Sequence, residues 1–199
     1  MALHLVIFGR QGSGKGTQSQ HLVDTFGVVH VSTGDMLRAA IADQTEMGLA
    51  AKAIVDGGGL VDDKTMCGIV QDRLAADDVI ERGVLLDGFP RTPNQADQLV
   101  LILGDRPIDA AINLEVSIQE VTARMLARGR VDDTPEGIAK RLDLYESQTR
   151  PLLDWFEERQ LLITVDGLGG EEEVFERIRS ALSRGIEGDT EVGTPRDGE

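Results

Sequence analysis

Short apolar runs alternate with longer stretches of helical spacing along most of the chain. The apolar runs indicate buried strands, as in a parallel sheet covered on both faces, and they lie at residues 3–8, 28–31, 84–88, 110–116 and 161–167. Between them, apolar positions recur at the intervals of a helix, most clearly at residues 15–26, 117–128 and 171–184. Strands that alternate with helices predict an α/β fold of three layers, with a five-stranded parallel sheet in the middle.

Two stretches interrupt this alternation. Residues 32–61 contain two short helical pieces and end in DGGGLV, and residues 129–137 are polar and rich in turn formers, so both are expected to be flaps. The chain is therefore predicted to form one domain over residues 1–184. The core of this domain is predicted to be residues 1–31, 62–128 and 138–184. Residues 185–199 are acidic and glycine-rich and have almost no large apolar side chains, a composition that predicts a disordered tail.

The sequence GRQGSGKGTQ, residues 9–18, joins the first predicted strand to the first predicted helix. Its glycines and Lys15 fit the phosphate-binding pattern G-x-x-x-x-G-K-[ST], except that Gly16 stands where the pattern has serine or threonine and Thr17 comes one residue late. In such a loop, backbone N–H groups surround a phosphate at the helix N-terminus and the lysine reaches the terminal phosphates. A plain glycine-rich turn is the alternative, but a turn does not require so many glycines and a lysine. The loop therefore predicts a P-loop NTPase-type fold that binds a nucleotide.

Composition narrows the class of protein. The chain has 199 residues and a net charge of −15, which argues against nucleic acid as a partner, because binding a phosphate backbone needs a basic face. Apolar runs fall well short of the ~20 residues of a membrane span, and the first residues do not have the pattern of a signal peptide. Cys67 is the only cysteine, so an internal disulfide is excluded. We expect a cytoplasmic protein with neither a membrane nor a nucleic-acid partner.

Three further motifs contain charged residues, two of them at the ends of predicted strands and the third at the end of a predicted helix. STGDMLR (32–38) follows the second strand, contains hydroxyl residues that can cap a helix, and ends in Arg38. LLDGFPRT (85–92) puts Asp87 at the end of a buried strand, where a carboxylate can hold magnesium through water. RMLARGRVDD (124–133) concentrates arginines beside a flap, which in an acidic protein favours an anionic ligand. The carboxyl ends of parallel strands meet at one edge of the sheet, so the loops that bear residues 9–15, Thr33 and Asp87 are expected to converge.

With these motifs, the chain resembles the adenylate kinases of the short-lid bacterial type over about residues 3–182. The resemblance rests on GxxGSGKGTQ, STGDMLR, DGFPRT with Gln95 close behind, RGRVDD and RPLL (150–153), in that order. Nucleoside monophosphate kinases have Lys-Gly-Thr in the loop, which accounts for Gly16. The resemblance implies reversible phosphoryl transfer from MgATP to AMP, giving two ADP by direct in-line transfer without a covalent intermediate. It also implies a monomer, a role in adenine nucleotide homeostasis, an AMP-binding flap at residues 32–61 and a lid at residues 129–137.

The same resemblance implies roles for individual residues. Those implied to bind ATP are Gly12, Ser13, Gly14, Lys15, Gly16, Thr17, Arg124, Arg128 and Gly169. Those implied to bind AMP are Thr33, Gly34, Arg38, Gly59, Leu60, Val61, Gly88, Phe89, Pro90, Arg91, Gln95, Arg130 and Arg141, with Gln95 at the edge of the adenine. The cations implied to act at the transferred group are Lys15, Arg38, Arg91, Arg128, Arg130 and Arg141. Mg²⁺ is implied to be held by phosphates and water, with Thr17, Asp35 and Asp87 beyond the water.

The chain departs from the family pattern in three places. Arg10 and Gln11 stand where the family usually has prolines, which predicts a less rigid loop and affects ATP affinity rather than chemistry. Asp62 and Asp63 follow the flap where a proline-containing turn is common, so the end of the flap is less sharply defined. The lid is short and has no cysteines for zinc.

The expected chemistry needs positive charge more than a base. A phosphate oxygen of AMP is already anionic, so a general base is not required, and His4, His21 and His30 are expected to be structural or surface groups. A kinase for CMP or UMP is the nearest alternative, but such relatives tend to have a smaller residue at position 33, so Thr33 together with Gln95 favours AMP. A non-catalytic nucleotide sensor would usually lack the lysine or several arginines, but all of them are present here. A GTPase switch would have the base-recognition sequence N-K-x-D, which this chain lacks.

Overall fold

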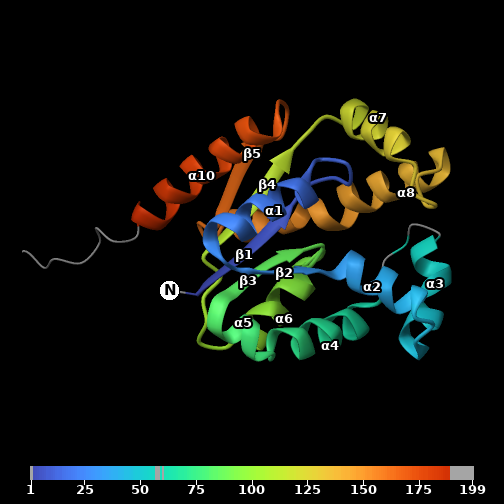
Figure 1. Cartoon of the computed structure of the whole chain (residues 1–199), viewed down its shortest axis with the longest axis horizontal. Coiled ribbons are helices and arrows are strands. Elements are labelled where there is room, and N and C mark those ends of the chain that lie inside the picture. The colour runs from blue at the N-terminus through green and yellow to red at the C-terminus, as the bar shows by residue number, and fades with distance from the viewer. Residues whose placement is uncertain (1, 57–58, 60, 189–199) are drawn as a thin grey trace, which may run out of the picture.

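A five-stranded, all-parallel sheet forms the middle layer, with the strand order β2-β3-β1-β4-β5 (Figure 1). The computed structural model describes residues 2–56, 59 and 61–188. The strands are β1 (Leu3–Phe8), β2 (Val29–Ser32), β3 (Gly83–Asp87), β4 (Ala110–Glu115) and β5 (Leu162–Asp166). Each begins and ends within one residue of the predicted bounds, because the apolar runs that bury both faces also set the strand lengths.

Helices cover both faces of this sheet. In chain order they are α1 (Lys15–Phe26), α2 (Thr33–Ala42), α3 (Glu46–Asp56), α4 (Asp63–Leu74), α5 (Asp77–Arg82), α6 (Pro93–Leu103), α7 (Ile118–Arg128), α8 (Pro135–Leu144), the π-helical turn η1 (Tyr145–Thr149), α9 (Arg150–Glu157) and α10 (Glu171–Gly188). One apolar cluster joins α1 and α10 to one face through Leu22 and Ile178, and another joins α4, α6 and α9 to the opposite face through Val70, Leu99 and Phe156. The predicted three-layer α/β fold is confirmed.

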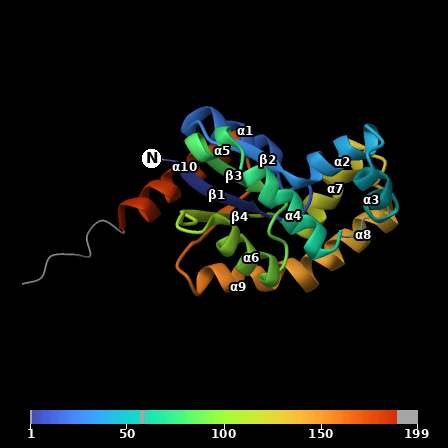
Figure 2. The same ribbon diagram turned by 90° about the horizontal axis from the view of Figure 1, so that it is seen from below.

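The segments predicted to be flaps gather at one end of the molecule. Figure 2 shows α2 and α3 beside α7 and α8, beyond the carboxyl ends of the strands. Helices α2 and α3 pack on each other and connect β2 to α4, while the predicted lid begins at the αL cap Gly129 and runs into the first turn of α8. This end of the molecule is where ligands of parallel α/β sheets collect.

The C-terminal helix is longer than the predicted domain. Helix α10 continues to Gly188, so residues 185–188 of the expected tail are helical. A single glycine such as Gly185 costs a helix only about 1 kcal/mol relative to alanine, which is not enough to end it. The rest of the predicted tail, residues 189–199, lies outside the described residues. Among the residues that are described, no helix is long and apolar enough to cross a membrane.

Helix α9 is held against α6 by the chain's single tryptophan. The Trp155 indole Nε1 donates a hydrogen bond of 2.9 Å to Asp97, and the Arg159 guanidinium lies 3.7 Å from the centre of the ring. The ring also packs edge-on against Phe156, with the two ring centroids 4.7 Å apart. This contact closes the core on the face of the sheet opposite α1 and α10.

Candidate active site

The glycine-rich loop after β1 has the backbone that a phosphate site requires. Gly12 and Gly14 have φ angles of +84° and +100°, which residues other than glycine adopt only with strain. Beside Gly16 there is open space, because a Cβ added there would meet nothing within 4 Å. The N-terminus of α1 is therefore open to an anion, and Gly16 keeps that approach free.

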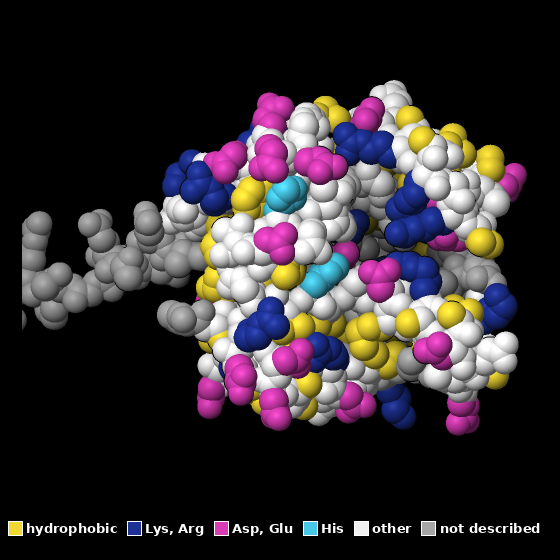
Figure 3. All heavy atoms as spheres, in the orientation of Figure 1, with side chains coloured by type: hydrophobic (Ala, Val, Ile, Leu, Met, Phe, Trp, Pro, Cys, Tyr) yellow, Lys and Arg dark blue, Asp and Glu magenta, His cyan; other side chains and the backbone are white. Residues whose placement is uncertain are grey.

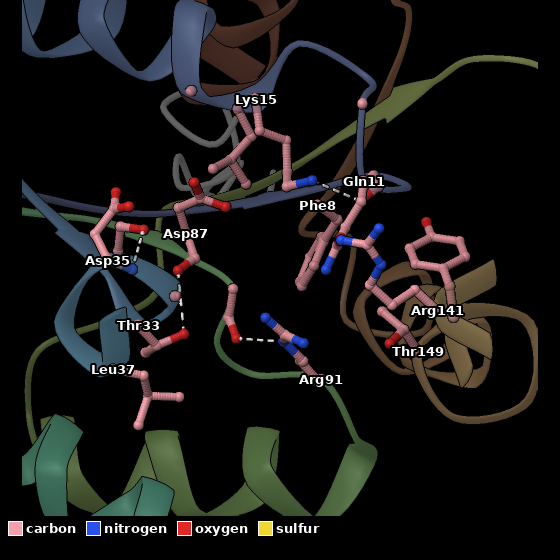
Figure 4. Close-up of a pocket in the computed structure, with 18 of the residues that line it drawn as sticks. Phe8, Gln11, Lys15, Thr33, Asp35, Leu37, Asp87, Arg91, Arg141 and Thr149 are labelled. Atoms are coloured by element: carbon pink, nitrogen blue, oxygen red, sulfur yellow. Dashed lines mark hydrogen bonds between the residues drawn. The ribbon is translucent and has the colours of Figure 1, made fainter. Parts of the chain in front are cut away.

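Lys15 lies across the mouth of this loop (Figure 4). Its Nζ donates hydrogen bonds of 2.8 Å and 3.1 Å to the carbonyl oxygens of Gly9 and Arg10. Loss of solvation lowers the pKa of Lys15, and the neighbouring Arg91 acts in the same direction, while Asp87 opposes it. An anion at the loop would supply the negative charge that this lysine lacks.

Side-chain contacts hold the loop where the family usually has prolines. Arg10 donates from Nη1 to the carbonyl oxygen of Val116 at 3.0 Å and from Nε to Glu146 at 2.9 Å, and its guanidinium lies over the Tyr145 ring. The Oε1 atom of Gln11 accepts a hydrogen bond of 2.6 Å from Arg141. The loop is thus tied to η1 and α8, the segments that follow the predicted lid.

A second group of residues lies at the ends of β2 and β3. The Thr33 hydroxyl donates to the backbone oxygen of Asp87 at 3.4 Å, and Arg91 Nε donates to the backbone oxygen of Gly88 at 2.8 Å. Figure 4 shows Thr33 and Arg91 around the same space, opposite Lys15. Arg38 is ion-paired with Asp35 at the start of α2. A second anion could therefore be held on this side, facing the loop.

Asp87 at the end of β3 faces Lys15 and the His30 ring, whose Nε2 lies 3.8 Å from a carboxylate oxygen. Burial acts to raise the pKa of Asp87, but the imidazole and the charges of Lys15 and Arg91 outweigh it and lower that pKa. The carboxylate is consequently ionised at neutral pH. Such a group fits a divalent cation that arrives with a nucleotide and is reached through water. Within the described ranges, no three or more His, Cys, Asp or Glu gather as direct metal ligands.

Two arginines that flank the lid, Arg128 at the end of α7 and Arg141 on α8, are bound to carboxylates of the lid itself. Arg128 and Arg141 both bind Asp133, at 2.9 Å and 2.8 Å, and the Asp133 side chain is fully buried. Arg141 is also ion-paired with Asp132. Burial opposes ionisation of Asp133, yet the hydrogen bonds from Arg128 and Arg141 keep its pKa well below the usual value. Asp133 therefore fixes both guanidinium groups at the rim of the cavity.

These groups enclose a cavity of about 470 Å³. Of its lining residues, seven are basic and three are acidic, although the chain as a whole has a net charge of −15. Figure 3 shows Lys and Arg side chains gathered around this hollow, while Asp and Glu are scattered over the rest of the visible face. The basic residues are Lys15, Arg38, Arg91, Arg124, Arg128, Arg130 and Arg141. The cavity is thus built for a ligand with several negative charges.

Comparison with known proteins identifies the class of ligand that this cavity binds. The family model for adenylate kinase matches residues 7–161. The chain belongs to the adenylate kinase family. An adenylate kinase of Xanthomonas oryzae pv. oryzae is 43% identical over 188 residues, covering 92% of this chain and all of the relative. An adenylate kinase of Methanosarcina barkeri is 38% identical over 214 residues, covering 92% of this chain and 99% of the relative. The activity of the chain is accordingly that of an adenylate kinase, the interconversion of ATP plus AMP and two ADP.

Most of the site residues that are implied by the resemblance to adenylate kinases line the cavity. Besides the seven basic residues, they are Gly12, Gly14, Gly16, Thr17, Thr33, Gly34, Asp35, Gly59, Val61, Asp87, Gly88, Pro90 and Gln95. Ser13, Phe89 and Gly169 are not among the lining residues: Ser13 and Phe89 are buried, and Gly169 lies in the loop before α10. Leu60 falls outside the described residues. The binding roles of all these residues stay predictions.

The cavity of this adenylate kinase also includes a residue that the motifs do not contain. His30, expected to be a structural or surface group, lines the cavity beside Asp87. It lies on β2 two residues before Ser32, and residues two apart on a strand point to the same face. Because Ser32 begins the STGDMLR motif, the spacing of two residues between His30 and Ser32 is the sequence signal that could have placed His30 at the site.

Proposed function

We propose that this one cavity holds both nucleotides of the reaction at once, ATP along the loop after β1 and AMP between α2 and the end of β3. The observation that carries this proposal is the ring of seven basic residues around one cavity, contributed by the start of α1, the flap, the segment after β3, α7, the lid and α8. Two nucleotides bring several negative charges to one point, and these cations offset the repulsion between them. In the proposed complex Gln95 contacts the AMP base and Thr33 lies beside AMP.

The proposed reaction is direct and in line. An oxygen of the AMP phosphate attacks the γ-phosphorus of ATP, the bond from that phosphorus to the β–γ bridging oxygen breaks, and ADP leaves with the electron pair. The nucleophile is anionic, so a proton need not be removed. Arg91 and Arg38 hold the acceptor phosphate. The charge of the transferred group spreads over three oxygens, and the cations that hold this group are Lys15, Arg128, Arg130 and Arg141.

A magnesium ion bound to ATP would offset phosphate charge and would be reached through water by Asp87, with Asp35 and Thr17 as further outer groups. The flap and lid exclude water from the cavity, which protects ATP from hydrolysis. Helix α8, whose first turn belongs to the lid, comes close to the flap: Nζ of Lys140 is 3.8 Å from where a Cβ on Gly59 would sit. We further propose that the protein is a monomer in the cytoplasm.

A coupled assay of ADP formation tests the proposal. The purified chain with Mg²⁺ and ATP is given AMP, CMP or UMP in turn, and the reverse reaction is started from ADP alone. We expect rapid turnover with AMP and slow turnover with CMP and UMP, and a strong loss of rate in EDTA. A preference for CMP or UMP would overturn the assignment of the acceptor site, and turnover that is insensitive to EDTA would remove Mg²⁺ from it.

A further inference from the structure

The buried side chain of Gln95 is held from two sides by other groups of the protein. Its Nε2 donates a hydrogen bond of 2.6 Å to Oδ1 of Asp63, and its Oε1 accepts one of 2.8 Å from the backbone N–H of Arg91. Gln95 is 3% exposed, lies in the first turn of α6 and lines the cavity. Asp63 begins α4, directly after the flap.

These two contacts allow a single orientation of the carboxamide. A carboxylate only accepts hydrogen bonds and a backbone N–H only donates them, so Nε2 must face Asp63 and Oε1 must face Arg91. Turning the amide over would set Oε1 against the Asp63 carboxylate and Nε2 against an N–H group. Both contacts would then be repulsive. The placement of nitrogen and oxygen follows from the chemistry of the neighbours.

Asp63 is itself fixed in place. Its Oδ2 accepts hydrogen bonds from Asn94 Nδ2 at 2.8 Å and from the Thr92 hydroxyl at 3.4 Å, both at the start of α6. With Gln95, three side chains of one helix start converge on this carboxylate. The carboxylate therefore acts as a rigid partner rather than as a mobile surface group, and it joins the end of the flap to α6.

The fixed amide has one N–H and one oxygen lone pair left for a ligand, in a set order. Adenine presents an acceptor ring nitrogen next to a donor amino group, and this matches that order. Hypoxanthine has the same size and shape but presents a ring N–H next to a carbonyl oxygen, which is the reverse order. A Gln95 side chain free to turn over would fit both bases equally well.

We infer that Asp63 is a specificity-determining positioning residue, which locks the Gln95 carboxamide so that the acceptor site takes the amino-substituted purine of AMP and rejects its oxo counterpart, IMP. The inference rests on the proposed function, in which Gln95 contacts the AMP base. A site built to hydrogen-bond one pattern rejects the other because its buried polar groups would be left unpaired. Asp63 acts through Gln95 and does not touch the substrate.

The test compares Asp63→Asn with Asp62→Asn, measuring initial rates with AMP and with IMP at saturating MgATP. Asp62 is the exposed neighbour that caps α4 by accepting from the N–H of Thr65 at 3.0 Å, and asparagine caps equally well. For Asp63→Asn we expect the ratio of kcat/KM for AMP to that for IMP to fall about tenfold, the equivalent of one net hydrogen bond. The KM for ATP should not change. Asp62→Asn should keep the wild-type ratio, and Asp63→Glu should restore part of it.

A ratio in Asp63→Asn equal to that in Asp62→Asn overturns the inference. If Asp63→Asn does not fold, as judged by circular dichroism, Asn94→Ala decides instead: it loosens the carboxylate from the exposed side, and the ratio should fall about twofold to threefold. An unchanged ratio in Asn94→Ala would again overturn it. Failure of the proposed function looks different, because the wild-type protein would then form no ADP from AMP.

Discussion

At the scale of single residues, the cavity depends on cations that other groups of the protein hold in place. Arg38, Arg128 and Arg141 are paired with carboxylates. Arg91 is bonded through Nε to a backbone oxygen, which leaves the outer edge of its guanidinium for a phosphate. Loss of solvation lowers the pKa of Arg91, although an arginine stays protonated at any pH of interest. A phosphate bound at this edge would favour the charged form of Arg91, which burial disfavours.

Arg91→Ala should fold but lose about 10³-fold in kcat, since Arg91 is proposed to hold the acceptor phosphate in line with the transferred group, and a single well-placed arginine contributes about that much to phosphoryl transfer. The measurement is ADP formation under saturating substrates, with a thermal melt to confirm folding. Arg179→Ala is the matched control, because Arg179 makes a surface ion pair with Glu176 far from the cavity. Near-normal turnover in Arg91→Ala would remove this residue from the proposed catalytic set.

His4 makes stability depend on pH. It is 5% exposed, neither ring nitrogen has a hydrogen-bond partner, and burial lowers its pKa, with Asp109 opposing and Arg106 adding to the shift. The folded protein therefore favours the neutral ring, so stability from this group is complete above about pH 6.5 and is lost as the pH falls below it. His4→Gln should flatten the dependence of unfolding free energy on pH between about 7.5 and 5.5. His21→Gln serves as the control, and an unchanged slope in His4→Gln would contradict the prediction.

At the scale of elements, the phosphate loop is braced by the segment that follows the lid. Arg10 reaches Glu146 of η1 and the carbonyl oxygen of Val116 after β4. Proline would restrict the backbone of the loop from within, whereas Arg10 restrains it through contacts with other elements. Loop and lid segment are therefore mechanically connected, and a shift in one displaces the other.

Arg10→Ala should raise the KM for ATP about fivefold and leave the KM for AMP nearly unchanged, since about 1 kcal/mol of bracing is lost on the ATP side of the cavity. Arg150→Ala is a suitable control, because Arg150 binds the other oxygen of the same Glu146 but is exposed and does not reach the loop. Steady-state kinetics with each substrate varied in turn measures both constants. Equal effects of the two variants would show that the brace has no role in ATP binding.

The elements that the sequence predicted well are those whose lengths are set by burial. Strand bounds followed from the apolar runs, and the helices at 15–26 and 117–128 from the helical spacing of apolar positions. Contacts between distant segments were not predictable: Asp63 looked like a departure at the end of the flap, although it orients Gln95 on another helix. Ser13 and Phe89 belong to motifs but are buried. Their burial was not predictable, because a motif does not say which of its side chains face the core.

At the scale of the whole molecule, an acidic protein surrounds a basic cavity. The excess of Asp and Glu lies outside the cavity, and the seven cations are confined to the end where flap and lid face each other. An anion that approaches the acidic exterior is repelled, while the cavity attracts it at short range. Flap, lid and sheet edge together make one site, which none of them makes alone.

A dinucleotide with two adenosines joined by a phosphate chain should therefore bind more tightly than ATP or AMP. At about a thousand times its Kd it should add about 4 kcal/mol to the free energy of unfolding. Thermal melts with each ligand at equal concentration measure this. A rise in Tm no greater than that with ATP alone would contradict simultaneous occupation of both sides of the cavity.

The placement of Trp155 has a practical consequence for spectroscopy. Its indole is packed between α9 and α6 and is not among the residues lining the cavity. Since the chain has one tryptophan, its emission reports on the apolar cluster between α9 and α6, which also contains Leu37, Ala51 and Val61 of the flap. Fluorescence should therefore follow denaturation of the core, and a shift in emission on nucleotide binding would report a rearrangement of the flap side of that cluster.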